Sequence, residues 1–489
     1  MAINVVELFA GVGGFRLGLE GEPGAAAESE FRVSWANQWE PSVKKQHAAE
    51  IYAHHWGMEY VGDGIYISKE GDVLSNQNIQ NVQSNDIPDH DVLCGGFPCQ
   101  DYSVARTISG ELGIDGEKGK LWTSIHRILV EKANKSKIVF LENVPRLLNS
   151  PASKRGLNFS KIVIDLLNLG YSVEWRVINA AEYGFPQKRK RVFILAYLNS
   201  EVNSPLAAQS SMSQVEYEES VYRWLSDDSI QSAGPFSRAF PCSLEKKSMK
   251  LEQVGIKEYN KNKSPFQNTG YAWMDHHGMA WSYSGKAKSR YDGTFSTLGD
   301  AVEQEVDSSF YVTDEEKLRK YRYIKGEQKE WRIRKPDKSS AQDIDAGDGR
   351  NLWEYYQELT NGYDTLDWAK SFSSNAYKEG IKQKIVYHYS AGAMAYPDLL
   401  QNPSRTIITA EVGTSVSRTR HIIEPEKETY RRLTPVELEK LNGFPRDWTG
   451  VGKVSDSRRG FLMGNALVIG VVRKLAGPLA DVLLRGPSS

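Results

Sequence analysis

Short apolar runs alternate with amphipathic segments through residues 1–198, which is the pattern of strands separated by helices. Runs of this length are typical of strands buried in a parallel sheet. Strands are predicted at residues 3–9, 31–35, 91–94, 137–141, 171–179 and 192–197, and helices at residues 121–130 and 162–169. The alternation predicts an α/β fold. Residues 57–85 are polar and dotted with glycine, and we expect them to form a surface insertion.

The alternation of strands and helices fades after residue 199. From there to about residue 402, serine, lysine, aspartate, tyrosine and tryptophan dominate. Aromatic residues remain frequent, which favours a separate folded domain over disorder. Within this domain, residues 290–298 combine aromatic rings, hydrogen-bonding side chains and a cation, while residues 315–338 are dense in both charges and predict a solvated helix and loop.

Regular structure is expected to return near the C-terminal end of the chain. Residues 403–409 restore an apolar pattern. Thr434 as the N-cap, Pro435 at the first helical position and Gly443 after the last turn predict a short helix. A terminal helix is expected over residues 464–484, with apolar spacing that indicates packing against the first domain.

Composition places the chain among globular proteins with an ample core. It has 489 residues, of which 40% are apolar and 25% charged. Three cysteines form neither a disulfide framework nor a zinc pattern, so we expect a reducing, cytoplasmic location and no metal. No apolar run is long enough to span a bilayer, so we expect no membrane segment. The net charge of −1 gives no overall basic signature, so a polyanion would have to bind at a localised positive cleft.

Residues 9–15 (FAGVGGF) form a glycine turn between a predicted strand and a helix. This arrangement suits a nucleotide, but the Gly-x-Gly-Gly spacing is not the dinucleotide pattern, and a plain strand–helix turn is an equal interpretation. At the end of the next strand, Gln38 and Glu40 face the same way, and either is placed to hold ribose hydroxyls. Trp39 is placed to lie against an adenine ring and Asp86 to accept a hydrogen bond from its amine.

Cys99 follows a buried strand on a stiff turn with the sequence GGFPCQ (residues 95–100). A cysteine presented in this way is a candidate nucleophile, although an isolated Pro-Cys pair is more often structural. Glu142 ends another predicted strand, where its carboxyl is placed to assist the thiol. The glycine-rich residues 103–120 suit a lid over a substrate. Arg189 and Arg191 share a face if their strand begins early, where they are placed to hold a phosphate or a carbonyl oxygen.

Six segments together resemble, in order and spacing, the motifs of the cytosine-C5 DNA methyltransferases. They are residues 9–15, 95–103, 142–144, 187–191, 432–445 and 464–468. The resemblance implies an α/β fold with an S-adenosylmethionine-dependent, Rossmann-like sheet domain and a second, smaller target-recognition domain. It divides the chain into a catalytic and cofactor-binding domain (residues 1–198), a target-recognition domain (residues 199–430) and a C-terminal segment (residues 431–489) that returns to the first domain.

The resemblance also implies a reaction and its partners. A thiolate from Cys99 adds to C6 of a cytosine flipped out of duplex DNA, which makes C5 nucleophilic enough to capture a methyl group, and Glu142 stabilises the charge at N3. Arg189 and Arg191 hold the base or its phosphate. The expected setting is a restriction–modification system, with a monomeric enzyme and a restriction endonuclease as a genetic rather than a physical partner.

The resemblance assigns residues to the cofactor and to DNA. S-adenosylmethionine is expected to contact Phe9, Ala10, Gly11, Gly13, Gly14, Phe15, Gln38, Trp39, Glu40, Asp86, Ile87, Pro98, Leu121, Asn465 and Ala466. DNA is expected to contact Gln100, Ser103, Thr297 and Leu298. The family often has glutamate where this chain has Gln38, so the choice between Gln38 and Glu40 for the ribose stays open.

Three other functions compete with this interpretation. An RNA methyltransferase of the same chemistry is disfavoured by the long region at residues 199–402, and a catalytically silent DNA-binding regulator by the intact Pro-Cys-Gln and Glu-Asn-Val sequences. A Rossmann oxidoreductase is disfavoured by the glycine spacing and has no need of a nucleophile. The Asp/Asn-Pro-Pro-aromatic motif of amino-group DNA methyltransferases is not found.

Overall fold

The computed structural model describes residues 2–24, 29–41, 43–97, 120–198, 234–255, 259–275, 277–324, 330–347, 349–360, 374–383, 385–389, 395–413 and 421–485. Cys99, Pro98, Gln100, Ser103 and most of the glycine-rich segment 103–120 lie outside these ranges. The chain divides into two compact units. The first comprises Met1–Glu303, Gln401–Thr409 and Pro435–Ser489, and the second comprises Gln304–Leu400 and Ala410–Thr434.

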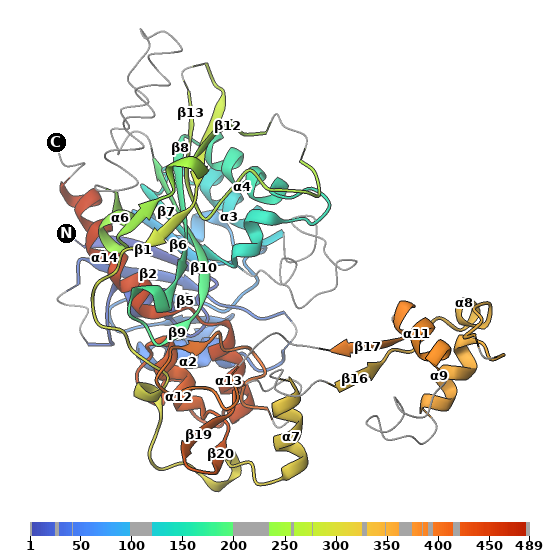
Figure 1. Ribbon diagram of the computed structural model, residues 1–489. Coiled ribbons are helices and arrows are strands. Elements are labelled where there is room, and N and C mark those ends of the chain that lie inside the picture. The colour runs from blue at the N-terminus through green and yellow to red at the C-terminus, as the bar shows by residue number, and fades with distance from the viewer. Residues whose placement is uncertain are drawn as a thin grey trace. The chain divides into compact units, whose positions relative to one another are not determined.

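The first unit is built on one large mixed sheet, in which the described strands follow the order β12-β14-β13-β8-β10-β7-β6-β1-β2-β5-β4-β3 (Figure 1). Its parallel part consists of β1 (Ile3–Leu8), β2 (Phe31–Asn37), β5 (Val73–Ser75), β6 (Val92–Gly96) and β7 (Ile138–Asn143). β1 pairs with β2 on one side and with β6 on the other. The order of strands along the sheet therefore reverses between β1 and β6, because the chain first adds β2 on one side of β1 and later adds β6 on the other. In open α/β sheets, ligands bind at the carboxyl ends of the strands at such a reversal.

The antiparallel part of the sheet begins at β10 (Lys190–Leu198), which lies between β7 and β8 (Tyr171–Asn179). It continues through β13 (Thr269–Met274), β14 (Ala280–Gly285) and β12 (Lys250–Gln253). The described part of residues 234–303 therefore belongs to the first compact unit, so the units do not divide at residue 198. The reason is that β13 pairs directly with β8, a contact between segments about ninety residues apart that no local pattern reveals.

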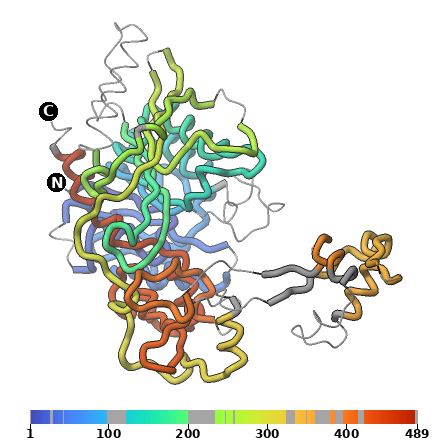
Figure 2. Tube along the Cα trace, in the orientation of Figure 1, coloured from blue at the N-terminus to red at the C-terminus, as the bar shows by residue number. Residues whose placement is uncertain are grey.

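Helices cover the sheet and bring the C-terminal segment back to the N-terminal one (Figure 2). α3 (Lys120–Glu131) and α4 (Leu157–Asn168) supply Ile125, Ile128 and Phe159 to the core beneath β6 and β7. The terminal helix α14 (Ile469–Arg485) packs on α1 (Gly14–Leu19) so closely that a side chain at Gly18 would overlap Val472. The expected return of this helix to the first domain is confirmed, but its start is not: α13 (Asp456–Asn465) ends at Asn465 and α14 begins only at Ile469.

Residues 57–85 contain three short strands that extend the sheet, so this segment is not only a surface insertion, although β3 is largely exposed and β4 partly exposed. β5 extends the parallel sheet beside β2, and β3 (Glu59–Gly62) and β4 (Ile65–Ile67) complete that edge. Leu74 and Ile79 are buried in the core. Strands of three or four residues are too short to show a periodic pattern of apolar and polar residues, so the sequence did not predict them. Asp86 lies in the short 3₁₀ helix Ser84–Asp86.

The second unit combines small helices with two-stranded sheets. Its elements are α7 (Glu315–Ile324), β16 (Glu330–Ile333), α8 (Lys338–Gln342), α9 (Leu352–Thr360), α11 (Ser374–Lys382), β17 (Val386–Tyr389), β19 (Ile423–Glu426) and β20 (Thr429–Arg431). α7 is the charged helix expected within residues 315–338, and Lys320 pairs with Glu316 on it. None of the helices in the described ranges has the length and apolar character needed to cross a lipid bilayer.

Candidate active site

β1 and β6 are neighbours in the sheet, and each leads into one of the predicted site segments. The register of β1 and β6 pairs Leu8 with Gly95, and a side chain at Gly95 would overlap the carbonyl oxygen of Leu8. Glycine is therefore required there for the two strands to approach. The glycine turn begins directly after Leu8, and the chain passes from Gly96 through Phe97 towards Cys99. Because each of the two predicted site segments directly follows one of these neighbouring strands, both segments begin at the same edge of the sheet.

The glycine turn has a backbone suited to a cofactor. Phe9 has a φ of 56°, Gly11 of 58° and Gly13 of 90°, all in the left-handed region that is unfavourable for side chains. A side chain at Gly13 would overlap the ring of Trp56, whereas one at Gly11 would have no described atom within 4 Å. The turn is thus packed on one side and open at Gly11, which fits a bound adenosine group.

Gln38 supports the glycine turn from the end of β2. Its side chain is 7% exposed, and its Oε1 accepts a hydrogen bond from the Gly11 N–H at 2.7 Å. Glu40 forms an ion pair with Arg458 of α13. Trp39 is partly exposed beside them. The Gln38 amide oxygen is thus engaged within the protein, and the choice between Gln38 and Glu40 for the ribose stays a prediction.

The other predicted cofactor residues lie in different environments. Asp86 is exposed, Ile87 is fully buried in the core, and Leu121 is partly buried in the first turn of α3. Asn465 is exposed at the end of α13, and Ala466 is half-buried. The structure brings this last segment to the glycine turn, because the side chain of Leu467 lies 3.2 Å from the position of a β-carbon on Gly14.

Glu142 lies beside the strand that leads to Cys99. The register of β6 and β7 pairs Gly96 with Glu142, and Glu142 Oε2 lies 3.0 Å from the position of a β-carbon on Gly96. Arg191, at the start of β10, places its Nε 2.7 Å from Glu142 Oε1. Burial raises the pKa of Glu142, against the opposing charges of Arg191 and Arg189. Burial thus shifts the balance of this carboxyl towards its protonated form.

Asn143 is a positioning residue to which the sequence analysis gave no role. It is 1% exposed, and its Nδ2 donates to the carbonyl oxygen of Phe97 at 3.2 Å. Its Oδ1 accepts from the N–H of Val144 at 2.8 Å. Asn143 thereby fixes the backbone just before Pro98. The signal was the motif Glu-Asn-Val itself, in which an amide follows the carboxylate.

Arg189 and Arg191 do not lie on one strand as expected and make different hydrogen bonds, although the charges of both act on Glu142. Arg189 is 2% exposed and donates to the carbonyl oxygens of Ile407, at 3.3 Å, and Gly464, at 2.8 Å. The expectation required one continuous strand, but β9 (Gln187–Lys188) ends before Arg189 and β10 begins after it. Arg189 thus joins three segments of the first unit, whereas Arg191 reaches Glu142.

The two predicted DNA contacts at residues 297 and 298 differ in accessibility. Leu298 is 1% exposed, so its side chain packs in the protein, and the expected DNA contact at this residue stays a prediction. Thr297 is half-buried and its N–H donates to Asp300 at 2.7 Å. Phe295, which was not singled out, is 51% exposed in the same segment. The apolar side chain of Leu298 at the end of a polar run was the signal for burial.

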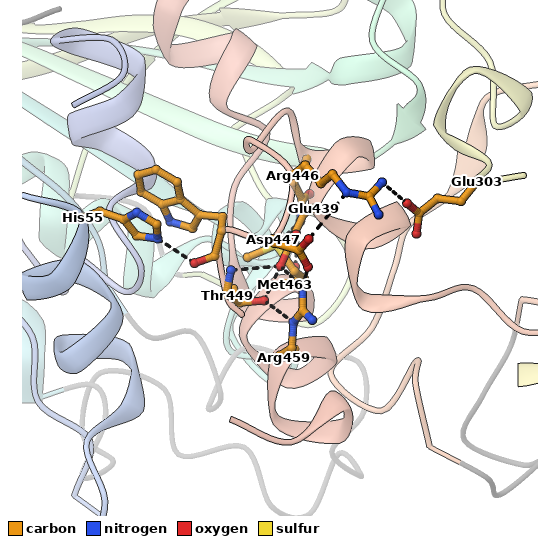
Figure 3. Close-up of polar contacts among 10 residues, drawn as sticks. His55, Glu303, Glu439, Arg446, Asp447, Thr449, Arg459 and Met463 are labelled. Carbon is orange, nitrogen blue, oxygen red and sulfur yellow. Dashed lines mark hydrogen bonds and ion pairs between the residues drawn. The ribbon is translucent and has the colours of Figure 1, made fainter. Parts of the chain in front are cut away.

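The C-terminal return segment supplies further residues around the glycine turn, and no local sequence pattern predicted them. In Figure 3, His55, Glu439, Thr449 and Arg459 lie together in this region. Trp448 donates from its indole N–H to the carbonyl oxygen of Val12 at 2.8 Å. Glu439, on α12 (Pro435–Asn442), is fully buried. Residues of this kind leave no local signal, because a helical glutamate is usually solvated.

Glu7 is a buried carboxyl directly behind the glycine turn. Burial raises its pKa from 4.5 to about 8, against the opposing Arg16 charge and a hydrogen bond from the Tyr52 hydroxyl at 3.1 Å. Because the folded pKa lies above the unfolded one, the folded protein loses stability as pH rises from about 4.5 to about 8. Glu7→Gln should therefore be more stable than wild type by about 4 kcal/mol near pH 8, and equal to it near pH 4.

Urea unfolding at a series of pH values measures this difference. Glu59→Gln, at an exposed position on β3, is the matched control and should show no pH-dependent difference. A Glu7→Gln protein that is less stable than wild type at pH 8 would contradict a neutral Glu7.

Comparison with known proteins agrees with the motifs. The family model described as C-5 cytosine-specific DNA methylase matches residues 3–480. The type II methyltransferase M.Sau3AI of Staphylococcus aureus is 33% identical over 98% of this chain and 96% of its own length. The type II methyltransferase M.HhaI of Haemophilus parahaemolyticus is 35% identical over 40% of this chain and 50% of its own.

A solved structure supports the fold. The Entamoeba histolytica methyltransferase EhMeth aligns over 99% of both chains with a TM-score of 0.53 and 15% identity. The Rossmann-like methyltransferase fold is thereby confirmed, and the oxidoreductase interpretation is excluded by the family match. This chain belongs to the C-5 cytosine-specific DNA methylase family, and it is an enzyme that transfers a methyl group from S-adenosylmethionine to C5 of cytosine in DNA.

Proposed function

We propose that this enzyme is the modification methyltransferase of a type II restriction–modification system and methylates one cytosine within a short duplex sequence. The supporting observation is the similarity to the S. aureus type II methyltransferase, which extends over 98% of this chain and so includes the region outside the motifs. A cognate endonuclease is its genetic partner. The enzyme works as a monomer in the cytoplasm, together with the DNA that it methylates.

For the reaction, we propose that Cys99 is the nucleophile and that Glu142 and Arg191 act beside it. The observation that carries this proposal is the register of β6 and β7, which sets the Glu142 carboxyl against Gly96, three residues before Cys99. The thiolate forms a bond to C6, and electron density moves towards N3 and C5. The target must leave the base stack first, because C6 is inaccessible within a duplex.

Glu142 stabilises the negative charge that develops on the base. Its raised pKa favours the protonated carboxyl, which donates to N3 as negative charge forms there. Arg191 holds the carboxyl in place through the 2.7 Å contact to Oε1. S-adenosylmethionine supplies an electrophilic methyl group. The residues proposed to hold it are Phe9, Gly11 and the neighbouring glycine turn, Trp39, either Gln38 or Glu40, and the segment at Asn465. Loss of the C5 proton and elimination of the thiolate then release the product.

Residues 199–430 are proposed to read the target sequence. Replacing them with the equivalent region of a family member that has a different target should transfer the donor's target to the hybrid, with the same chemistry. The exchange is best limited to residues 304–400 and 410–430, because β12, β13 and β14 are strands of the catalytic sheet. Bisulfite sequencing of DNA methylated by the hybrid measures the outcome. A hybrid that still modifies the original site would contradict the recognition role.

The proposed function as a whole is tested in cells. DNA from cells that express the chain is analysed by bisulfite sequencing, and unconverted cytosines should cluster at one position of one short sequence. The same DNA should resist an endonuclease that cuts this sequence. Unconverted cytosines scattered without a sequence preference would contradict a restriction–modification role.

A further inference from the structure

Trp448 links the C-terminal return segment to the glycine turn. Its indole N–H donates to the carbonyl oxygen of Val12 at 2.8 Å, and the ring is 3% exposed. Val12 lies between Gly11 and Gly13, whose positive φ values give the turn its shape. Because this hydrogen bond is made to the backbone of the turn itself, it restrains the conformation of the turn.

Trp448 packs against other aromatic rings, one stacked on it and others at an angle to it. The ring of His55 stacks on the Trp448 ring, with 3.5 Å between the ring centroids and an angle of 6° between the two ring planes. Trp56 meets it edge-on at 5.6 Å, and the same Trp56 ring fills the space beside Gly13. His55 Nε2 lies 2.7 Å from the Trp448 carbonyl oxygen, so this nitrogen carries the proton and donates. The glycine turn therefore rests on an aromatic cluster formed by His55, Trp56 and Trp448.

The backbone that carries Trp448 is anchored by a buried carboxylate (Figure 3). Glu439 Oε1 accepts from the N–H of Thr449 and from Arg459 Nη2, each at 2.9 Å. Arg459 also contacts the Thr449 hydroxyl at 3.0 Å and Asp447 at 3.0 Å. Residues on either side of Trp448 are thus tied to α12 and α13. Arg446 is paired with Glu303, the last residue of the first unit before the chain enters the second.

We propose that Trp448 is a positioning residue for S-adenosylmethionine, which acts by holding the Val12 carbonyl and with it the conformation of the glycine turn. The strained φ at Phe9 and the open space at Gly11 make the turn dependent on outside support. A preformed turn spares the cofactor the cost of ordering it, so the support acts on cofactor affinity and not on the methyl-transfer step. The inference rests on the proposed placement of the cofactor at the glycine turn.

Trp448→Phe tests the proposal, because it keeps an aromatic ring and removes the N–H. The KM for S-adenosylmethionine should rise about fivefold to tenfold, while kcat at saturating cofactor and the KM for DNA stay within about twofold of wild type. Calorimetric titration with S-adenosylhomocysteine, without DNA, should show the same loss of affinity. Thr449→Val removes one anchor of the segment and should raise the KM in the same direction by about twofold to threefold, which gives a second measurement if Trp448→Phe folds poorly.

Trp175→Phe is the matched control. Trp175 is fully buried on β8, and its indole N–H donates to the Gln267 carbonyl oxygen at 3.1 Å. Both tryptophan variants should lose thermal stability, but only Trp448→Phe should lose cofactor affinity. Gly11→Val alters the turn directly and should weaken cofactor binding if the cofactor lies there.

The outcomes separate the two proposals. Unchanged affinity in Trp448→Phe together with weakened binding in Gly11→Val would overturn the role of Trp448 and leave the cofactor at the glycine turn. Unchanged affinity in both variants would overturn the role of Trp448 and the cofactor placement together. Equal loss of affinity in Trp448→Phe and Trp175→Phe would also overturn it, because the effect would then follow from stability alone.

Discussion

Cys99→Ser should abolish methyl transfer, lowering kcat by about a thousandfold or more, while DNA binding and the fold are retained. The reason is that attack on C6 needs a thiolate, and a serine hydroxyl is a far weaker nucleophile at neutral pH. Loss of a covalent nucleophile removes the step that activates C5, so residual binding interactions cannot compensate. Transfer of a radiolabelled methyl group to DNA measures the rate, and a gel-shift assay measures binding.

The other two cysteines provide the control. Cys94 is fully buried on β6, and burial raises the pKa of its thiol well above the ordinary range, so it is a poor source of thiolate. Cys242 is also buried, at the start of β11 (Cys242–Leu244). Cys242→Ser should retain activity. A duplex with 5-fluorocytosine at the target should trap a covalent adduct, and a peptide map that places it on Cys94 or Cys242 would contradict the assignment.

Glu142→Gln should lower kcat by about a hundredfold to ten-thousandfold, with little change in the KM for either substrate. Glutamine has nearly the same shape and can donate a hydrogen bond to N3, but it cannot transfer a proton as charge develops. It also loses the charge partner of Arg191, which lies 2.7 Å from Oε1. Single-turnover kinetics with preformed enzyme–DNA complex isolates the chemical step from binding.

Glu174→Gln is the matched control for Glu142→Gln. Glu174 is a buried glutamate on β8, and burial raises its pKa, as it does that of Glu142, but Glu174 lacks the contact to β6. This variant should keep the wild-type rate of methyl transfer. If both variants lose activity to the same extent, the effect of Glu142→Gln arises from a disturbance of core packing and not from the loss of a group that takes part in the reaction.

The fold of the catalytic domain and its activity were predictable because their signals are local. The strand over residues 171–179 was predicted with the bounds that β8 has, and β1, β2, β6 and β7 lie within about two residues of expectation. A buried parallel strand needs a continuous apolar run, and the turn that follows it carries residues whose type is fixed by chemistry. The motifs therefore identified the family and the cofactor, and the family match confirms both.

The sequence by itself thus determined the strands, the order of the motifs and the reaction that they imply. Only the tertiary structure decided how the supporting side chains are used. Gln38 meets Gly11 across 27 residues of chain, Arg189 meets Gly464 across 275, and Trp448 meets Val12 across 436. A hydrogen bond of this kind depends on which segments the fold brings together, and the residue type alone is compatible with many partners. For this reason the contacts of the buried Arg189 guanidinium with Ile407 and Gly464, and that of Trp448 with Val12, were found only in the folded chain.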